Sequence, residues 1–259
     1  MTRNERLGYI MQTLRVSKGS SVQDLADQLG VSHMTVRRDL AGLMAEQQVQ
    51  MFHGSVTLHP STGEDTPESH YSLITAGSKN TEQKAKIGKL AASLIENDDT
   101  LIIDCGSTTE YLAKCLPEDR RYTVLCYSLN IASETARRKN VRLMFSGGLF
   151  HENTLMFESP EGLEMIRNFR ATKAFISASG ISEKFGVTCL NFYERETKKT
   201  IIRSSMKKIL LADSSKFGIV RSDRFAEYRD FDEIITDEGI PEDAAETLRR
   251  MGVVLRIAS

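Results

Sequence analysis

The stretch from Ser20 to Leu40, SSVQDLADQLGVSHMTVRRDL, constrains the fold most, because it encodes two short helices joined by a tight turn. Ser21 and Asp24 have the spacing of a helix N-cap and its capping-box partner. Apolar residues follow at helical spacing and predict one buried stripe: Val22, Leu25, Ala26 and Leu29. Gly30 suits the left-handed position that often ends a helix, and Ser32 suits the N-cap of the next helix. The stretch therefore predicts a helix-turn-helix.

The second of these helices has two dissimilar faces. When each residue is advanced by about 100°, one face collects apolar residues: Val36, Leu40 and Leu43. The opposite face carries Thr35, Arg38 and Ala41, and Arg37 lies on its flank. A hydroxyl and two guanidiniums on an open face match a recognition helix that meets base edges and phosphates in the major groove of DNA. The alternative is a solvated face on an ordinary helical hairpin. We favour DNA because the cap, turn, stripe and cations agree with one another.

The flanking sequence completes a winged helix-turn-helix. Upstream, apolar residues at helical spacing predict another helix: Leu7, Ile10, Met11 and Leu14. Downstream, residues 49–52 and 55–58 have the character of two short strands around His53 and Gly54. His33 has two interpretations, a DNA contact or a solvated helix start. The residues predicted to contact DNA are Ser32, His33, Thr35, Arg37, Arg38 and His53.

This N-terminal region resembles the DeoR family of bacterial sugar-metabolism repressors, whose signature runs through VS-x-x-T-[IV]-RRDL into a wing ending in HGG. The chain has Val31-Ser32, then Thr35 to Leu40 as TVRRDL, then His53-Gly54-Ser55. It departs from the pattern in the wing, where Met51-Phe52 stands in place of a common basic residue and Ser55 replaces the second glycine. The resemblance implies operator DNA as a partner.

Length and composition limit the alternatives. The 259 residues suit a DNA-binding domain over 1–58, a linker over 59–80 that can include ordered portions, and a larger domain over 81–259. A net charge of −1 does not decide for or against DNA, because binding depends on where the cations lie. No signal peptide and no run of 18 apolar residues is evident, so we expect a cytoplasmic protein without a membrane span. The four cysteines lack metal-ligand spacing, and we expect neither a metal nor a cofactor.

The C-terminal part alternates strand-like and helical segments, which predicts an α/β domain with a largely parallel sheet. A helix marked by Lys84, Ile87 and Leu90 leads into it. The predicted strands are Thr100–Asp104, Tyr122–Cys126, Val141–Phe145, Lys173–Ser177, Lys208–Ala212 and Glu233–Thr236.

The clearest chemistry in this domain is the segment Asp104-Cys105-Gly106-Ser107-Thr108-Thr109, where an apolar strand passes into a helix. Glycine lets the backbone approach a ligand, hydroxyls donate hydrogen bonds, and a helix N-terminus presents free N–H groups to an anion. The segment predicts a phosphate cradle. An ordinary strand-to-helix turn with capping hydroxyls is the alternative. We expect the cysteines to be reduced, mostly buried thiols; the alternative for Cys105 is unusual reactivity, because it lies beside the predicted helix N-terminus.

The domain as a whole resembles the DeoR-family sensor domain, a fold akin to ribose-5-phosphate isomerase. Motifs that carry the resemblance include Ser128-Leu129-Asn130, Gly186-Val187-Thr188 and Asp213 to Gly218. The residues from Cys126 to Asn130, CYSLN, resemble the branch of the family that includes the deoxyribonucleoside-operon repressor. The resemblance implies that Gly106 to Thr109 hold phosphate. The effector-binding residues expected are Asp104, Gly106, Ser107, Thr108, Thr109, Ser128, Gly147, Gly148, His151, Glu194, Lys198 and Lys216.

Three residues of that set have competing interpretations. Glu194 and Lys198, one helical turn apart, either project together toward sugar hydroxyls or form a surface ion pair of little energetic value. His151 is either a pocket wall or a loop-packing residue.

An enzymatic function has to be compared with a regulatory one. A sugar-phosphate isomerase-like enzyme with an accessory DNA-binding domain is the alternative, but the strand end at Ser177 to Ile181 lacks the carboxylates that such chemistry needs. We therefore expect a repressor of a carbohydrate or nucleoside catabolic operon. It binds double-stranded operator DNA as a homo-oligomer and is released by a phosphorylated sugar.

Overall fold

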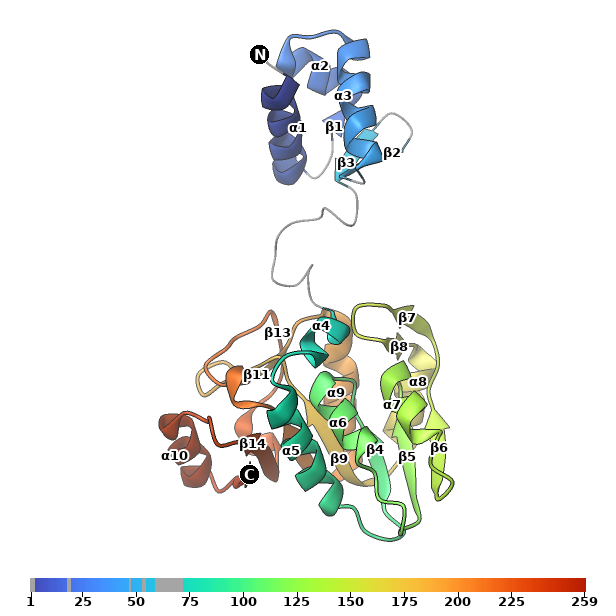
Figure 1. The fold of residues 1–259 in the computed structure, drawn as a ribbon, viewed down its shortest axis with the longest axis vertical. Coiled ribbons are helices and arrows are strands. Elements are labelled where there is room, and N and C mark those ends of the chain that lie inside the picture. The colour runs from blue at the N-terminus through green and yellow to red at the C-terminus, as the bar shows by residue number, and fades with distance from the viewer. Residues whose placement is uncertain (1–2, 18–19, 47, 53–54, 59–71) are drawn as a thin grey trace. The chain divides into compact units, whose positions relative to one another are not determined.

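The computed structural model describes the 259-residue chain except for residues 1–2, 18–19, 47, 53–54 and 59–71 (Figure 1). The chain divides into two compact units, Met1–His70 and Tyr71–Ser259, and each is described by itself. No helix among the described residues is long and apolar enough to cross a membrane.

The first unit is a winged helix-turn-helix, as predicted. Its elements in chain order are α1 (Arg3–Ser17), β1 (Ser20–Ser21), α2 (Val22–Leu29), α3 (His33–Ala45), β2 (Val49–Phe52) and β3 (Ser55–Leu58). The strands form one antiparallel sheet in the order β1-β3-β2. Strand β1 is an addition to the predicted elements, because two serines before a helix give no strand signal.

Local capping explains why the helices begin and end where they do. The Asp24 backbone N–H donates to Ser21 Oγ at 3.0 Å, which with the Asp24 side chain makes the predicted capping box. Gly30 is left-handed at φ 62°, and the Thr35 N–H donates to the N-cap Ser32 Oγ at 3.2 Å. These three features confirm the predicted caps, and Gly30 and Ser32 form the turn between α2 and α3. The buried core residues beneath them include Ile10, Leu14, Leu25, Val36, Leu40 and Leu43.

The second unit is built on a seven-stranded parallel sheet, which confirms the predicted α/β class (Figure 1). Its order is β15-β14-β12-β9-β4-β5-β6. The strands are β4 (Thr100–Ile103), β5 (Tyr122–Cys126), β6 (Val141–Phe145), β9 (Ala171–Ser177), β12 (Ser205–Leu211), β14 (Glu233–Asp237) and β15 (Val254–Ala258). Six of these correspond to predicted strands, with boundaries that differ by up to three residues.

Helices cover both faces of this sheet. Their bounds are α4 (Leu73–Gly77), α5 (Thr81–Ser93), α6 (Ser107–Lys114), α7 (Leu129–Thr135), α8 (Pro160–Asn168), α9 (Phe192–Ser204) and α10 (Glu242–Arg250). One core lies between the sheet and α5, α6 and α7, and a second lies between the sheet and α8, α9 and α10. The strands supply side chains to both cores because successive residues of a strand point to opposite faces. In β4, Leu101 and Ile103 lie in the first core and Ile102 lies in the second.

The second unit also contains smaller elements outside the seven-stranded sheet. An antiparallel hairpin joins β7 (Leu149–His151) and β8 (Met156–Glu158). A second small sheet has the order β10-β11-β13, with bounds Gly180–Ser182, Gly186–Cys189 and Asp223–Ala226. Short 3-10 turns occupy Ser214–Lys216 and Tyr228–Asp230. Of the segment expected as a linker, residues 72–80 lie within the second unit and include α4, and residues 59–71 lie outside the described residues.

Candidate functional site

The strand order reverses between β4 and β9, which predicts a ligand crevice beyond the carboxyl ends of these two strands. From β4 the chain proceeds outward through β5 to β6, whereas from β9 it proceeds outward in the other direction through β12, β14 and β15. Parallel sheets bind ligands where the strand order reverses, beyond the carboxyl ends of the strands. The segment Asp104 to Thr109 leaves β4 at that place, and Ser177 ends β9 beside it. The topology therefore brings the predicted cradle to the reversal point.

The start of α6 presents donors. The backbone N–H groups of Ser107, Thr108 and Thr109 have no acceptor among the described residues, as expected for a first helical turn. The Thr109 hydroxyl donates to the Gly106 carbonyl at 3.0 Å, so it serves the turn itself. The hydroxyls of Ser107 and Thr108 form no hydrogen bond with described residues. A helix start with free N–H groups and two such hydroxyls is suited to an anion.

Gly106 has a packing role as well. A Cβ at this position would lie 2.5 Å from Ser177 Oγ and 2.7 Å from Ser177 Cβ, which no side chain can accommodate. Glycine is therefore required where β4 and β9 meet.

A buried ion pair underlies the crevice. Lys198 Nζ lies 2.5 Å from Asp104 Oδ2, and both side chains are essentially inaccessible. The same ammonium donates to the Ser177 carbonyl and hydroxyl oxygens, each at 3.2 Å, and Tyr127 donates its hydroxyl to Asp104 Oδ1. Burial by itself lowers the pKa of Lys198, but the Asp104 carboxylate and its neighbours outweigh burial and raise that pKa well above its usual value. Lys198 is thus a charged group held in the floor of the site.

Glu194 completes this cluster from the first turn of α9. Its Oε1 accepts from Asn191 Nδ2 at 2.8 Å, and its Oε2 lies 3.6 Å from Lys198 Nζ. The side chains of Glu194 and Lys198 are only 7% and 1% exposed, so the surface-ion-pair interpretation is wrong. Cys105 lies 3.9 Å from Glu194 Oε2, and burial raises the pKa of the Cys105 thiol well above its usual value. Cys105 is thus a buried thiol, as expected for most of the cysteines, and the alternative of a reactive thiolate at this position is not supported.

The β7–β8 hairpin packs against the start of α9. The His151 ring stacks on Tyr193 with centroids 3.7 Å apart, and His151 Nε2 lies 2.9 Å from Glu158 Oε2. The Tyr193 hydroxyl donates to Asn153 Oδ1 at 2.7 Å, and burial raises the pKa of Tyr193 to about 12. His151 is thus held in a defined orientation against Tyr193, which immediately precedes Glu194 in α9.

Two lysines lie near the opposite rim. Lys84 is buried in α5 and donates its ammonium to the carbonyls of Ala76 and Lys79 at 2.5 and 2.7 Å. Burial lowers the pKa of Lys84, and the nearby Lys216 lowers it further against the opposing effect of Asp213. Lys216 is half-buried, and its ammonium forms no hydrogen bond or ion pair with the described residues, although its backbone N–H donates to the Asp213 carbonyl at 3.0 Å. Lys84 and Lys216 therefore lie near each other, with the Asp213 carboxylate beside them.

Three further predicted residues lie along the β5 and β6 side. Ser128 is buried, and its hydroxyl has no partner among the described residues. A Cβ on Gly148 would lie 2.2 Å from the Glu158 carbonyl oxygen, so this glycine is required by the β7–β8 hairpin. Gly147 has open space around its Cα.

Sequence reasoning missed four residues that the structure places in this region: Tyr127, Ser177, Tyr193 and Lys84. Lys84 carried a signal, since a cation occupied a position of the predicted apolar stripe that includes Ile87. Ser177 and Tyr127 carried a weaker signal, because each lies at the end of a buried strand.

In the first unit, the predicted DNA-contacting residues follow the start of α3. Ser32, His33, Arg37 and Arg38 are exposed, whereas Thr35 is half-buried and its hydroxyl lies 2.9 Å from Ser32 Oγ. His53 lies outside the described residues. On the inner face, buried Asp39 accepts from Arg6 Nε at 2.8 Å. This ion pair ties α3 to α1 with the arginine face outward.

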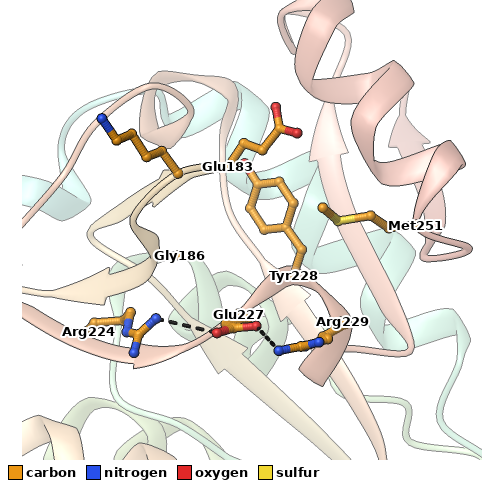
Figure 2. A pocket seen from close by; sticks show the side chains of 8 residues that line it. Glu183, Gly186, Arg224, Glu227, Tyr228, Arg229 and Met251 are labelled. Atoms are coloured by element: carbon orange, nitrogen blue, oxygen red, sulfur yellow. Dashed lines mark hydrogen bonds and ion pairs between the residues drawn. The ribbon is translucent and has the colours of Figure 1, made fainter.

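A separate cavity of about 450 Å³ lies beside β11, β13 and the end of α10, and Figure 2 shows its lining. Glu227 pairs there with Arg224 at 3.4 Å and Arg229 at 2.7 Å. The other lining residues are Glu183, Lys184, Gly186, Tyr228 and Met251. None of the predicted effector-binding residues lines this cavity.

An outward recognition helix in one unit and a crevice in a parallel sheet in the other define a DNA-binding transcriptional regulator with a sensor domain. Comparison with known protein families supports this class for both units of the chain. A DeoR-like helix-turn-helix domain matches residues 6–62, and a DeoR C terminal sensor domain matches residues 79–238. The chain belongs to the DeoR family.

Two relatives illustrate the similarity. The Deoxyribose operon repressor of Escherichia coli is 36% identical over 241 residues, which cover 93% of this chain and 92% of that protein. The HTH-type transcriptional regulator GolR of Listeria innocua is 30% identical over 254 residues, 98% of each. The chain is accordingly a transcriptional repressor and not an enzyme, and the isomerase alternative is not supported.

Among solved structures, ribose 5-phosphate isomerase A from Methanocaldococcus jannaschii matches 54% of this chain and 55% of its own. The TM-score is 0.40 and the identity 16%. A likeness at that level carries no argument about function.

Proposed function

We propose that a phosphorylated sugar binds the crevice between β4 and β9 and releases this repressor from its operator. The observation that carries the proposal is the start of α6. Its first N–H groups and the hydroxyls of Ser107 and Thr108 have no partners among the described residues, and they occupy the point where the strand order reverses.

The charge around the crevice favours a phosphate over a neutral group. Lys216 has no anionic partner among the described residues, and Lys84 bonds only to carbonyl oxygens. A phosphate would supply both lysines with acceptors. Hydrogen bonds between ionised groups are roughly twice as strong as those between neutral groups, so the phosphate would contribute most of the affinity.

Glu194 and His151 are proposed to face the sugar. Glu194 accepts from Asn191 and lies near Lys198, and its carboxylate can also accept from sugar hydroxyls. Asp104 and Lys198 neutralise each other beneath it. We propose that they hold the floor in shape while Gly147, Gly148 and Ser128 border the same crevice.

The relatives narrow the choice of sugar. Because the Escherichia coli protein of 36% identity is named a deoxyribose operon repressor, phosphates of deoxyribose are the first ligands to test. The target would then be an operon for deoxyribose or nucleoside catabolism. Since its partner is operator DNA, we propose that the protein acts in the cytoplasm.

We further propose that the repressor binds as a homo-oligomer. A single recognition helix reads few base pairs, and symmetric repressors present two such helices to two half-sites about one DNA turn apart. Release by effector then requires that the effector bind the DNA-competent arrangement more weakly than the incompetent one.

Isothermal titration calorimetry tests the effector. Deoxyribose, ribose and hexose phosphates are compared with the parent sugars, and the same compounds are added to a repressor–operator gel shift. We expect binding and release only with phosphorylated compounds. Comparable affinity for an unphosphorylated sugar would contradict the phosphate assignment.

Thr108→Ala is the variant of choice in that experiment. It removes a hydroxyl from the start of α6 and leaves the helix N–H groups in place. We expect effector affinity to fall while operator affinity stays unchanged. Ser93→Ala is the matched control, because it removes an exposed hydroxyl at the far end of α5. Gly106→Val is unsuitable, since a side chain there would collide with Ser177.

A further inference from the structure

Exposed apolar side chains gather around β6 and the β7–β8 hairpin. Leu149 is 67% exposed, and Phe145, Phe150 and Leu129 are 38%, 41% and 46% exposed. Phe145 and Phe150 form one surface, because the Phe157 ring centroid lies 5.2 Å from that of Phe145 and 5.0 Å from that of Phe150. An isolated exposed leucine is ordinary, whereas a contiguous set of this kind marks an interaction surface.

The same surface contains an unprotected sheet edge. Strand β6 is the last strand of the seven, so its outer edge has no partner strand among the described residues. Its sequence, VRLMF, holds one charge and no proline. Proteins that keep an edge strand solvated usually guard it with lysines, prolines or bulges. Apart from the exposed Arg142, strand β6 has none of these guards within its five residues, so it is suited to pairing with another strand.

We propose that β6 pairs antiparallel with β6 of a second copy of this chain, with Leu143 on the two-fold axis. The proposal gives an interface to the homo-oligomer proposed above and rests on it. In this register Val141 faces Phe145 of the other copy, and Arg142 faces Met144. The two sheets then continue as one, and the exposed apolar residues of both hairpins are brought beside the new pair of strands.

Charge supports a second copy as the occupant. In the proposed register Lys139 faces Gly147 of the other copy, so no like charges stand directly opposite each other. Strand β15 at the other edge lacks this self-complementarity, because pairing centred on Arg256 would place two guanidiniums opposite each other. Pairing β6 with β15 of another copy would leave free edges and extend into a filament. The two-fold pairing of β6 closes after two copies.

The proposed interface also adjoins the effector crevice. The β7–β8 hairpin that carries Leu149 and Phe150 also holds His151 against Tyr193. The Phe157 N–H donates to the Tyr127 carbonyl at 2.8 Å, next to the Asp104 cluster. The interface and the crevice therefore share one structural element.

Disulfide trapping tests the register in the full-length protein. Residues directly opposite in antiparallel strands have Cα atoms about 4.5–5.5 Å apart, within the span of a disulfide. Leu143→Cys is made in a Cys115→Ser background, because Cys115 is exposed. Oxidised glutathione should convert this variant into a covalent dimer. The two cysteine thiols form a disulfide, and the glutathione disulfide is reduced to two glutathione thiols. Arg142→Cys is the matched control and should stay uncrosslinked, because its Cα atoms would lie more than about 7 Å apart in this register.

Sedimentation equilibrium provides a second, independent measurement. Phe150→Arg places a charge on the apolar surface at a side chain that is 41% exposed, and we expect at least a hundredfold weaker self-association. Val254→Arg is the control on the other edge strand, where Val254 is 50% exposed, and should behave as the unaltered protein.

Several results would overturn the proposal: a monomeric unaltered protein, crosslinking of Arg142→Cys but not Leu143→Cys, or weakened association only in Val254→Arg. Folding of each variant is checked by circular dichroism. Neither DNA nor sugar phosphate is present in these measurements. They can therefore contradict the proposed interface without contradicting the effector proposal, and the calorimetry can contradict the effector proposal without contradicting the interface.

Discussion

Replacing Lys198 with methionine tests the buried ion pair beneath the crevice. Methionine nearly preserves length and volume, so the main loss is the ammonium 2.5 Å from Asp104 Oδ2. Removing one partner of a buried pair costs about 3–5 kcal/mol, because the other charge stays buried. Asp104 keeps hydrogen bonds from the Tyr127 hydroxyl and, at 2.8 Å, the Ser177 N–H, which places the expected loss near the lower figure.

Urea unfolding measures this loss. The chain has no tryptophan, but five of its seven tyrosines lie between Tyr111 and Tyr228, so near-ultraviolet circular dichroism reports mainly the sensor domain. At a slope of about 3 kcal/mol per molar urea, a loss of about 3 kcal/mol lowers the midpoint by about 1 M. Adding Asp104→Asn to Lys198→Met should restore part of the stability, since no unpaired charge then remains. A single variant that loses under about 1 kcal/mol, or a double variant whose losses simply add, would refute the reasoning.

The remaining predictions concern DNA, the recognition helix and pH. Arg38→Ala should weaken specific operator binding by about 1–3 kcal/mol in a gel-shift titration at fixed salt, and unchanged affinity would remove Arg38 from the interface. Asp39→Ala should lower the melting temperature of the isolated residues 1–58 by breaking the pair with Arg6, an unchanged melting temperature being the contrary result. In the folded chain the pKa values of Lys198 and Tyr127 both lie well above their usual values, because Asp104 stabilises the ammonium and burial disfavours the phenolate. The stability that depends on them is therefore present below about pH 10 and lost as pH rises further, which a urea midpoint measured from pH 8 to 11 should show.

The winged helix-turn-helix was predictable because its signals are local. Ser21, Gly30 and Ser32 act on residues within three or four positions of themselves, and the structure shows each in its predicted role. The two-residue strand β1 escaped prediction because its only support is pairing with β3, more than 30 residues away.

The sensor domain was predictable only in part, because its site depends on contacts between residues far apart in the sequence. Its central strands were predictable because they are short, continuous apolar runs. The site beneath the cradle was not, since Asp104 meets Ser177 and Lys198 across 73 and 94 residues of sequence. The spacing of Glu194 and Lys198 indicated that they share a helix face, but only the packing of α9 on the sheet shows that this face is buried. The small β10-β11-β13 sheet was missed for a related reason, because its strands are three or four residues long and β13 joins from 34 residues beyond its partner.

The long separations within the crevice also bear on synthesis of the protein. The DNA-reading unit lies within Met1–His70, whereas the proposed effector crevice includes residues as far along as Lys216. At a synthesis rate of about 5–20 residues per second, the ribosome takes roughly 10–30 s to cover that interval. During this time a nascent chain can hold a complete recognition helix and no place for a sugar phosphate. The recognition helix of each new chain is therefore complete before the residues of the proposed effector site and of the proposed β6 interface have been synthesised.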